Sequence, residues 1–313
     1  MSLFSGIGAF EKALRNLNID FELVGYSEID KYASKAYSLI HNVPESLNLG
    51  DITKIDEQNL LKNIDLITYS FPCQDISVAG KQKGFFDRGV KTRSGLFFDA
   101  LRIIQAVQPK IAIAENVKNL TSKRFKNEFE IVLNSLEMAG YNNYYAVLNA
   151  KDYGVPQNRE RIFIISILKS VDNNKFVFPK PIKTKETLGS ILENDAVLPI
   201  LHNIYGGFGE KKPRVFDTYS PTIRTAAGGG HIPSIWSNVS KSNRKLTPKE
   251  CFRLMGFEDK DINILIENKT SNTQLYKMAG NSVVVNVLEE IFKSLIDTQI
   301  IHTEKREVTH GHI

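Results

Sequence analysis

The sequence predicts a doubly wound α/β sheet joined to a second, smaller and irregular domain. Short apolar runs alternate with helical patterns over residues 1–168, glycines follow the first run directly, and the composition changes after Lys169. Alternating strands and helices are typical of a sheet whose two faces are covered by helices. With 313 residues, 42% of them hydrophobic and 24% charged, the chain is long enough for one large core and an attached domain.

The elements of the first domain can be placed in order along the chain. The first strand ends near Phe4 and turns through Gly6 and Gly8 into a helix over residues 10–17, whose apolar residues recur at helical spacing. A turn or strand end is expected at residues 48–52. Further strands are expected at residues 21–26, 66–69, 110–116, 145–148 and 161–165, and a further helix at residues 129–138.

The second half of the chain changes in character. From Lys169 to about Asn243 it is rich in Pro, Gly, Asn and Lys, which indicates turns and short strands. Helix resumes after Thr247, because residues 247–250 (TPKE) form a capping box with proline at the first helical position, and Gly256 follows as a stop. The last helix is expected at residues 284–295. We therefore divide the chain into domains at 1–168 and 169–270 and a segment at 271–313 that returns to the first.

The charge and cysteine content point to an intracellular protein with an anionic partner. The net charge is +5, and between Lys81 and Arg93 five cations stand against the single anion Asp87. Clustered positive charge of this kind favours nucleic acid. The chain has no signal-peptide pattern and no apolar run of about eighteen residues, so we expect a cytoplasmic protein with no membrane partner.

The remaining cysteine and histidine residues suggest structural positions. Cys251 lies in an apolar helical pattern and is expected in the core. A disulfide between Cys73 and Cys251 is the alternative, which reducing conditions in the cytoplasm disfavour. His310 and His312 lie in a tail without other ligands nearby, so we expect no metal site.

Cys73 is the most informative residue of the chain. It follows the β-rich run at residues 66–69 and precedes the basic loop at residues 80–95. A thiol at the carboxyl end of a strand lies where open α/β sheets carry out their chemistry. A thiol with a pKa near 8.5 is only about a tenth thiolate near neutral pH, so a neighbouring cation or helix end would assist it. The alternative is a buried structural cysteine.

The first turn has features of a nucleotide site. Gly6 and Gly8 let a ligand approach the backbone, Glu28 lies twenty residues further on where an acid commonly accepts ribose hydroxyl groups, and Asp51 could contact an adenine amino group. The full dinucleotide fingerprint fails, because its third glycine position is Glu11. A tight turn with two solvated acids is the alternative.

Two further groups stand at predicted strand ends. Glu115 closes an apolar run, and burial there favours the protonated form that suits a proton donor. A helix cap is the alternative for Glu115. Arg159 and Arg161 are one residue apart before a strand, so both point to one side, where they could hold a base carbonyl or a phosphate. A plain ion-pair turn is the alternative for the arginines.

In order, six segments resemble the DNA cytosine-5 methyltransferases of bacterial or phage restriction–modification systems. They span about two thirds of the chain in the order that is typical of the family. The segments are LFSGIG at residues 3–8, FPCQ at 71–74, ENV at 115–117, QNRER at 157–161, RKLTP with the residues up to Gly256, and GNSVV at 280–284. Ser2 stands where many relatives have Asp, and Ala9 where relatives often have glycine.

The resemblance implies an S-adenosylmethionine-dependent, Rossmann-like catalytic domain at residues 1–168 and a target-recognition domain at residues 169–270. It implies that Cys73 adds to carbon 6 of a cytosine flipped out of double-stranded DNA. Protonated Glu115 would hydrogen-bond ring nitrogen 3, and Arg159 and Arg161 would hold the base, with Arg161 as the base contact. The enzyme would then be a DNA cytosine-5 methyltransferase that acts as a monomer without a metal, and a cognate restriction endonuclease would act separately.

The resemblance also assigns binding residues. The residues expected to bind S-adenosylmethionine are Phe4, Gly6, Gly8, Glu28, Ile29, Asp51, Ile52, Pro72, Asn281 and Val283. The residues expected to contact DNA are Gln74, Lys81, Lys83, Arg88, Arg93, Thr222, Arg224, Thr225 and His231. The loop at residues 81–93 would close over the DNA as a lid.

Three other functions remain open at this point. The first is a tRNA cytosine-5 methyltransferase with the same chemistry, which the separate module before the motif near residue 244 disfavours. The second is a nucleotide-dependent oxidoreductase, which would leave Cys73 and Glu115 unexplained. The third is a catalytically silent DNA-binding homologue, which the intact Cys73, Glu115 and Arg161 disfavour.

Overall fold

Two main sheets organise the part of the chain that the computed structural model describes. The structure describes residues 1–73, 75–76, 83–87, 89–183, 186–202, 212–225 and 232–300. The larger sheet has six strands in the order β2-β1-β3-β6-β8-β7. Their bounds are β1 (Ser2–Leu3), β2 (Tyr26–Ser27), β3 (Leu66–Tyr69), β6 (Ile111–Val117), β7 (Tyr141–Asn149) and β8 (Glu160–Leu168).

The strand directions define the edge of this sheet at which a ligand site is expected. β1 is parallel to β2 and β3, and β3 is parallel to β6, whereas β8 is antiparallel to both β6 and β7. The carboxyl ends of β1, β2, β3 and β6 therefore meet along one edge. In open α/β sheets this edge is where ligands bind.

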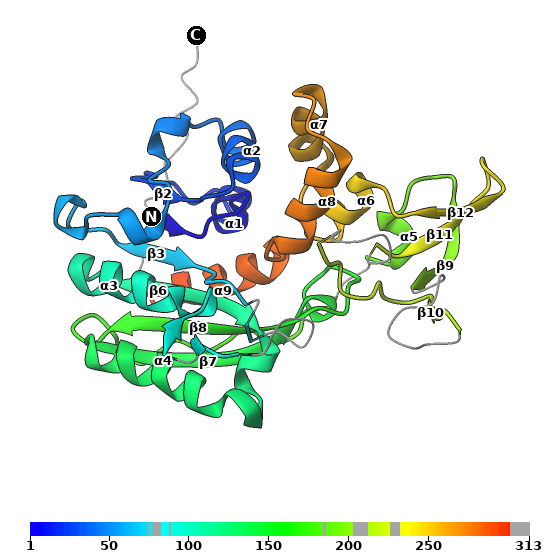
Figure 1. The fold of residues 1–313 in the computed structure, drawn as a ribbon. Helices are drawn as coiled ribbons and strands as arrows, with labels where there is room; N and C mark the ends of the chain where they lie inside the picture. The colour runs from blue at the N-terminus through cyan, green and yellow to red at the C-terminus, as the bar shows by residue number, and fades with distance from the viewer. Residues whose placement is uncertain are drawn as a thin grey trace, which may run out of the picture.

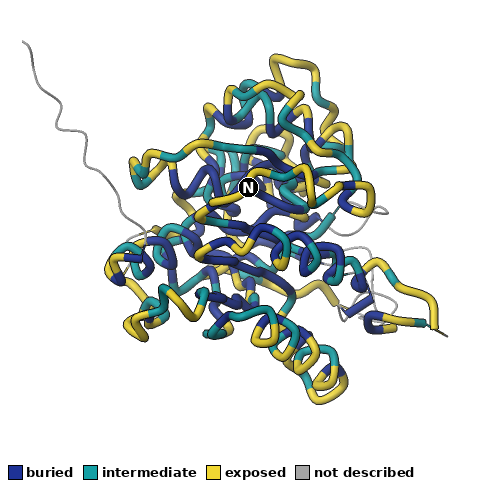
Figure 2. Tube along the Cα trace, turned by 90° about the vertical axis from the view of Figure 1, so that its left-hand side faces the viewer, coloured by how far each residue is buried: buried dark blue, intermediate teal, exposed yellow. Residues whose placement is uncertain are grey.

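Helices cover both faces of the larger sheet, as the sequence predicts for a doubly wound fold (Figure 1). On β6, Ile111 and Ile113 pack in a core with α1 (Ala9–Asn16), α2 (Lys31–His41) and α9 (Val285–Asp297). The alternate residues Ala112 and Ala114 pack in a second core with α3 (Phe97–Val107) and α4 (Lys126–Met138). The central strands are accordingly buried, while the helices expose their outer sides (Figure 2).

The second sheet is small and antiparallel. It has four strands in the order β10-β9-β11-β12, namely β9 (Ala196–His202), β10 (Arg214–Phe216), β11 (Ser234–Ser237) and β12 (Ser242–Lys245). Ile200 and Ile235 face the core that also contains residues of α6 (Pro248–Arg253), α7 (Asp259–Glu267) and α8 (Asn272–Asn281). These helices lie between the two sheets in Figure 1. The division at 169–270 remains a prediction.

Several local predictions can be compared with the structure. The capping box is confirmed, because Thr247 Oγ1 accepts from the Glu250 amide at 3.2 Å and the Glu250 carboxylate accepts from the Thr247 amide at 2.7 Å. The strand predicted at residues 21–26 is wrong, since only Tyr26 and Ser27 are in a strand. The physical reason is that β1, the strand with which it pairs, is two residues long.

A further two-stranded hairpin and one short helix complete the described elements. The hairpin consists of β4 (Phe86–Asp87) and β5 (Val90–Lys91), within the loop that was predicted to act as a lid. The short helix α5 (Leu188–Ile191) precedes the second sheet. Short 3-10 turns, η1 to η7, connect the main elements. Both cysteines are free thiols, and Cys251 is buried, as predicted.

One glycine allows α8 to pack closely against residues 224–225 of the second domain. A Cβ atom added at Gly280, near the end of α8, would lie 2.3 Å from the carbonyl carbon of Arg224 and 2.3 Å from the amide nitrogen of Thr225. Real Cβ atoms do not approach backbone atoms this closely. The close packing of these two segments therefore requires glycine at position 280.

We predict that Gly280→Ala lowers the free energy of unfolding by about 1–3 kcal/mol, because the methyl group displaces backbone atoms. Urea denaturation measures the change. Gly25→Ala is the matched control, since an added Cβ there would lie 3.5 Å from its nearest neighbour, which is ordinary contact. Equal stability of the two variants would contradict the packing that the structure shows.

Candidate active site

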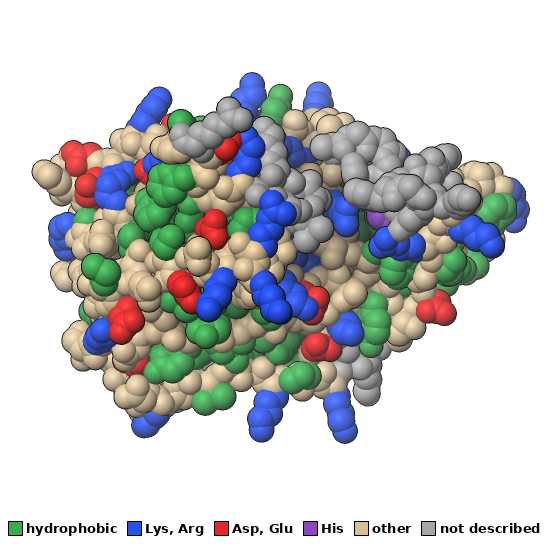
Figure 3. Space-filling view, turned by 60° about the horizontal axis from the view of Figure 1, so that its bottom comes forward, with side chains coloured by type: hydrophobic (Ala, Val, Ile, Leu, Met, Phe, Trp, Pro, Cys, Tyr) green, Lys and Arg blue, Asp and Glu red, His purple; other side chains and the backbone are tan. Residues whose placement is uncertain are grey.

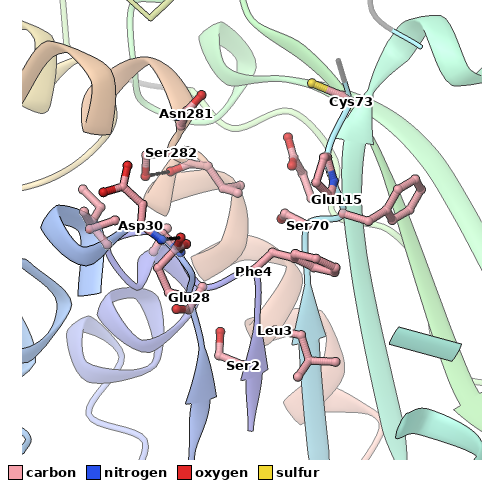
Figure 4. Close-up of a pocket in the computed structure, with 18 of the residues that line it drawn as sticks. Ser2, Leu3, Phe4, Glu28, Asp30, Ser70, Cys73, Glu115, Asn281 and Ser282 are labelled. Atoms are coloured by element: carbon pink, nitrogen blue, oxygen red, sulfur yellow. Dashed lines mark hydrogen bonds between the residues drawn. The ribbon is translucent and has the colours of Figure 1, made fainter. Parts of the chain in front are cut away.

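A cavity of about 360 Å³ lies at the carboxyl ends of β1, β2, β3 and β6. Its volume is in the range of small-molecule sites. Figure 4 shows Cys73 and Glu115 on one side, Glu28 and Asp30 on the other, and Asn281 with Ser282 on a third. The sequence-predicted residues that line it are Cys73, Glu115, Arg159, Arg161, Phe4, Gly6, Glu28, Ile29, Asp51, Ile52, Pro72, Asn281 and Val283.

Cys73 is held at the end of β3 by its neighbours. The Asn116 side-chain amide donates to the Phe71 carbonyl at 3.0 Å, and the Ile76 amide donates to the Cys73 carbonyl at 3.0 Å. The buried Phe71 ring packs against Phe97, with ring centroids 5.5 Å apart. These contacts fix the backbone on both sides of the half-buried thiol.

An ion pair faces Cys73 across the cavity wall. Arg161 Nε lies 3.0 Å from Glu115 Oε1, and both side chains are largely buried. Burial raises the pKa of the Cys73 thiol, the negative charge of Glu115 raises it further, and Arg161 opposes the rise. The thiol is therefore mainly protonated at neutral pH, and its reactivity depends on the charges around it.

Arg159 has a different surrounding from Arg161. It donates to the Ile223 carbonyl at 2.9 Å, to the Ser282 carbonyl at 2.8 Å and to the Gly280 carbonyl at 3.2 Å. Burial lowers the pKa of Arg159 to about 9, so its guanidinium group stays protonated at neutral pH. These three hydrogen bonds thus join the segment around Ile223 to the end of α8 and to Ser282 just after it, and joint binding of one group by Arg159 and Arg161 remains a prediction.

The turn after β1 is shaped by Glu28 and His41. Both carboxylate oxygens of Glu28 accept backbone amides, from Gly6 at 2.9 Å and from Asp30 at 2.7 Å. Burial raises the pKa of Glu28, and these two hydrogen bonds oppose the rise. Gly6 has φ +56° and no atom within 4 Å of an added Cβ, so its backbone is open to a ligand.

Gly8 is the one cofactor candidate outside the cavity lining. A Cβ added there would lie 2.2 Å from His41 Nε2, and the same nitrogen contacts the Ile7 carbonyl at 3.0 Å. Since a carbonyl only accepts, this contact assigns the proton to Nε2. Gly8 therefore allows α2 to pack beneath the turn, and its role in cofactor binding stays a prediction.

The other end of the cavity is more open. Ile29 is 75% exposed. Asp51 accepts from the Thr53 amide at 3.0 Å and from the Thr53 hydroxyl at 2.8 Å, and the hydroxyl hydrogen bond is the main cause of its lowered pKa. An ion pair between Asp30 and Lys277 of α8 also lines the cavity. This pair was not predicted, because its members are 247 positions apart.

The predicted DNA contacts are only partly described by the structure. Gln74, Lys81, Arg88 and His231 lie outside the described residues. Lys83 forms an ion pair with Asp87, Arg93 precedes the 3-10 turn η4 (Ser94–Leu96), and Thr222 donates to the Asn158 carbonyl at 2.6 Å. Arg224 and Thr225 lie against Gly280. Of these candidates, the described ones do not line the cavity, so a DNA role for them stays a prediction.

The described residues carry neither a candidate metal site nor a membrane-spanning helix. No group of three or more His, Cys, Asp or Glu side chains there is arranged to hold a metal ion. His310 and His312 lie beyond the described part. In the described part, no helix has both the length and the apolar character needed to cross a membrane.

Comparison with known proteins identifies similar sequences over the whole chain. The model of the family described as C-5 cytosine-specific DNA methylase matches residues 1–213 and 202–297. The type II methyltransferase M2.ScrFI of Lactococcus lactis is 36% identical, covering 95% of this chain and 98% of the relative. For M.HhaI of Haemophilus parahaemolyticus the identity is 35%, with 93% and 92% covered. The orphan methyltransferase M.SPRI of Bacillus phage SPR is 32% identical, with 96% and 98% covered.

Solved structures share the fold. The Dnmt2 methyltransferase of S. pombe matches with a TM-score of 0.67 at 22% identity, covering 95% of this chain and 98% of its own. The Entamoeba histolytica methyltransferase EhMeth matches with a TM-score of 0.68 at 18% identity, covering 95% and 97%. These likenesses confirm the predicted fold class.

We predict that alkylation of Cys73 by iodoacetamide speeds up with rising pH and has its midpoint above the pKa of an ordinary, solvent-exposed thiol. The sign follows from the raised pKa, because only the thiolate reacts. Glu115→Gln lowers the midpoint, since the negative charge of Glu115 contributes to the rise. Mass spectrometry of the labelled peptide measures the rate.

Cys73→Ser is the control for this measurement. It leaves only Cys251, which is fully buried and should stay unlabelled in the native protein. A rate at Cys73 that is already independent of pH near neutrality would contradict the electrostatic account.

Proposed function

The chain belongs to the family of C-5 cytosine-specific DNA methylases, and from this premise we propose that it methylates cytosine in DNA through a covalent adduct with Cys73. The observation that carries the proposal is the meeting of the Cys73 thiol with the Glu115–Arg161 ion pair in one cavity. A nucleophile, a proton-carrying group and a cation then surround one reacting ring.

The proposed reaction follows from the low electron density at carbon 5 of cytosine. It is a poor nucleophile, so electron density must first be supplied from elsewhere in the ring. The Cys73 thiolate forms a bond to carbon 6, and the ring π electrons move toward carbon 5 and nitrogen 3. After carbon 5 has accepted a methyl group, loss of its proton re-forms the ring double bond and expels the Cys73 thiolate.

Glu115 acts on the charge that develops in the ring. The ion pair with Arg161 uses Oε1 in the unliganded site, and we propose that Glu115 takes up a proton from solvent when cytosine binds, so that Oε2 can donate it to nitrogen 3. A hydrogen bond placed there favours the transition state over the ground state, because nitrogen 3 becomes more basic as the thiolate adds. Arg161 keeps the carboxyl group in this orientation and is the proposed contact to the base.

The opposite end of the cavity fits S-adenosylmethionine. Gly6 leaves its backbone open to a ligand, and an added Cβ there meets no atom within 4 Å. We propose that Glu28 accepts hydrogen bonds from the ribose hydroxyl groups and that Asp51 accepts one from the adenine amino group. Phe4, Ile29, Ile52, Pro72, Asn281 and Val283 would complete the walls. When bound, S-adenosylmethionine supplies the methyl group as an activated sulfonium.

The cavity also constrains how DNA is presented. A space of about 360 Å³ is far too small to admit a duplex. The target cytosine must therefore leave the helix before it reaches Cys73. The second domain would read the surrounding sequence, with Thr222, Arg224 and Thr225 as described candidates. We propose a monomer that acts on double-stranded DNA in the cytoplasm.

The kinds of relative bear on the biological role and on the choice of substrate. The relatives include bacterial type II methyltransferases and phage orphan methyltransferases. The type II relatives support protection of DNA from a separate restriction endonuclease. Transfer to tRNA is the second candidate substrate, and the family match to DNA methylases disfavours it.

We predict that Cys73→Ser lowers methyl transfer to duplex DNA by about a thousandfold or more, because the serine hydroxyl is a far weaker nucleophile. Affinity for DNA and for S-adenosylmethionine should persist. Transfer of a radiolabelled methyl group, with duplex DNA and tRNA as parallel substrates, measures the effect.

Cys251→Ala is the matched control, since Cys251 lies in the core and away from the cavity. It should retain most of the activity. Substantial methylation by Cys73→Ser would refute the nucleophile assignment, and preferential transfer to tRNA would refute the substrate.

A further inference from the structure

A short basic segment follows the strand that carries Glu115. Residues 118–127 contain four cations and no acidic residue. Val117 lines the cavity and directly precedes the 3-10 turn η5 (Lys118–Thr121). We call the side chains of Lys118, Lys123, Arg124 and Lys126 the basic shelf. It therefore begins at the same sheet edge as the active site.

The chain segment that carries the basic shelf contacts the loop that follows Cys73. The Asn119 side-chain amide, within η5, donates a hydrogen bond to the Ile76 carbonyl. On the far side of that loop, a Cβ added at Gly84 would lie 2.2 Å from Glu128 Oε1 in the first turn of α4. Asn119 and Glu128, which lie within and just after the segment that carries the shelf, thus contact Ile76 and Gly84.

The three lysines of the shelf are exposed and weakly neutralised. Lys118 is 54% exposed and pairs with Glu160 at 2.8 Å, and Lys126 is 72% exposed and lies 3.6 Å from Glu130. Exposed pairs of this kind contribute little. Lys123 has no ion-pair partner among the residues that the structure describes.

Arg124 is oriented by its neighbour. Its guanidinium carbon lies 5.7 Å from the ring centroid of Phe125, which is buried.

On the face shown in Figure 3, several Lys and Arg side chains gather near the centre, with a few acidic side chains beside them.

A structural role does not account for this clustering. Cations that precede a helix are disfavoured by its dipole and by one another, and Lys123, Arg124 and Lys126 all stand at the start of α4. Sequences depart from local rules of this kind mainly where function requires it. An anionic partner would offset both repulsions, because it attracts the same cations.

We propose that the basic shelf binds backbone phosphates of the DNA duplex beside the target cytosine. This inference rests on the proposed function, because the strand that delivers a base to the cavity must leave it past this edge. Phosphate contacts made by lysine and arginine position the duplex without reading its sequence. The shelf would therefore contribute affinity that is independent of the recognition sequence and sensitive to salt.

The test compares Lys123→Gln/Arg124→Gln with Lys110→Gln/Lys169→Gln. The control pair lies at the opposite sheet edge, where the Leu168 amide donates to the Lys110 carbonyl at 2.9 Å. Fluorescence anisotropy measures binding to a duplex of about 30 base pairs between about 50 and 200 mM salt. The melting temperatures of both variants show that they are folded.

We expect the shelf variant to bind the duplex about tenfold more weakly near physiological salt, and its slope of log affinity against log salt to fall by about two. The KM for S-adenosylmethionine should not change, since neither residue lines the cavity. Lys123→Arg with Arg124 intact should restore wild-type affinity, because charge and not shape is required.

Equal affinity and equal salt slope in the shelf and control variants would overturn the proposal. An equal loss in both would also overturn it, as an effect of net charge alone. Binding is measured without methyl transfer, so failure of the shelf proposal can be distinguished from failure of the proposed function. If the shelf variant loses DNA affinity as expected but the wild-type protein transfers no methyl group, the proposed function is refuted and the shelf proposal stands.

Discussion

The convergence of two parallel strand ends is the constraint on which the active site depends. β3 and β6 are paired in register from Leu66↔Ile111 to Tyr69↔Ala114. Because the register is fixed, the chain that leaves β3 toward Cys73 and the residue that follows Ala114 reach the same edge. Glu115 then meets Arg161 from the antiparallel neighbour β8, since Val117 pairs with Arg161 and the two strands run in opposite directions. Three groups that are distant in sequence are thus set around one point by backbone hydrogen bonds.

The same residues join the chemistry to the second domain. Arg159 lines the cavity and also binds the Ile223 carbonyl. Gln157 accepts from the Ile223 amide at 2.9 Å and donates to the Leu254 carbonyl at 2.6 Å. Ile223 directly precedes the residues that pack against Gly280. A displacement of the segment around Ile223, which we propose reads the DNA sequence, would therefore change the hydrogen bonds of Arg159, so this segment is mechanically connected to the cavity.

Features with a local cause were predictable from the sequence. The capping box at Thr247, the strand before Cys73 and the helices on either side of the sheet follow from patterns within about one turn or one strand. The ion pairs were not predictable, because Asp30 and Lys277 are 247 positions apart and no spacing indicates their contact. The paired arginines of the sequence analysis also have unlike surroundings, since Arg159 bonds to backbone carbonyls whereas Arg161 bonds to Glu115. The short β2 was missed because its length is set by β1 and not by its own apolar residues.

The central claim is that the sulfur of Cys73 becomes bonded to carbon 6 of the target cytosine. It is tested most directly with a duplex oligonucleotide that carries 5-fluorocytosine at the target, incubated with protein and S-adenosylmethionine. Fluorine at carbon 5 cannot leave as a proton does, so the account predicts a stable protein–DNA adduct that survives denaturing electrophoresis. Peptide mapping should place the adduct at Cys73. A bound duplex that forms no such adduct, or an adduct at any other residue, would contradict the account.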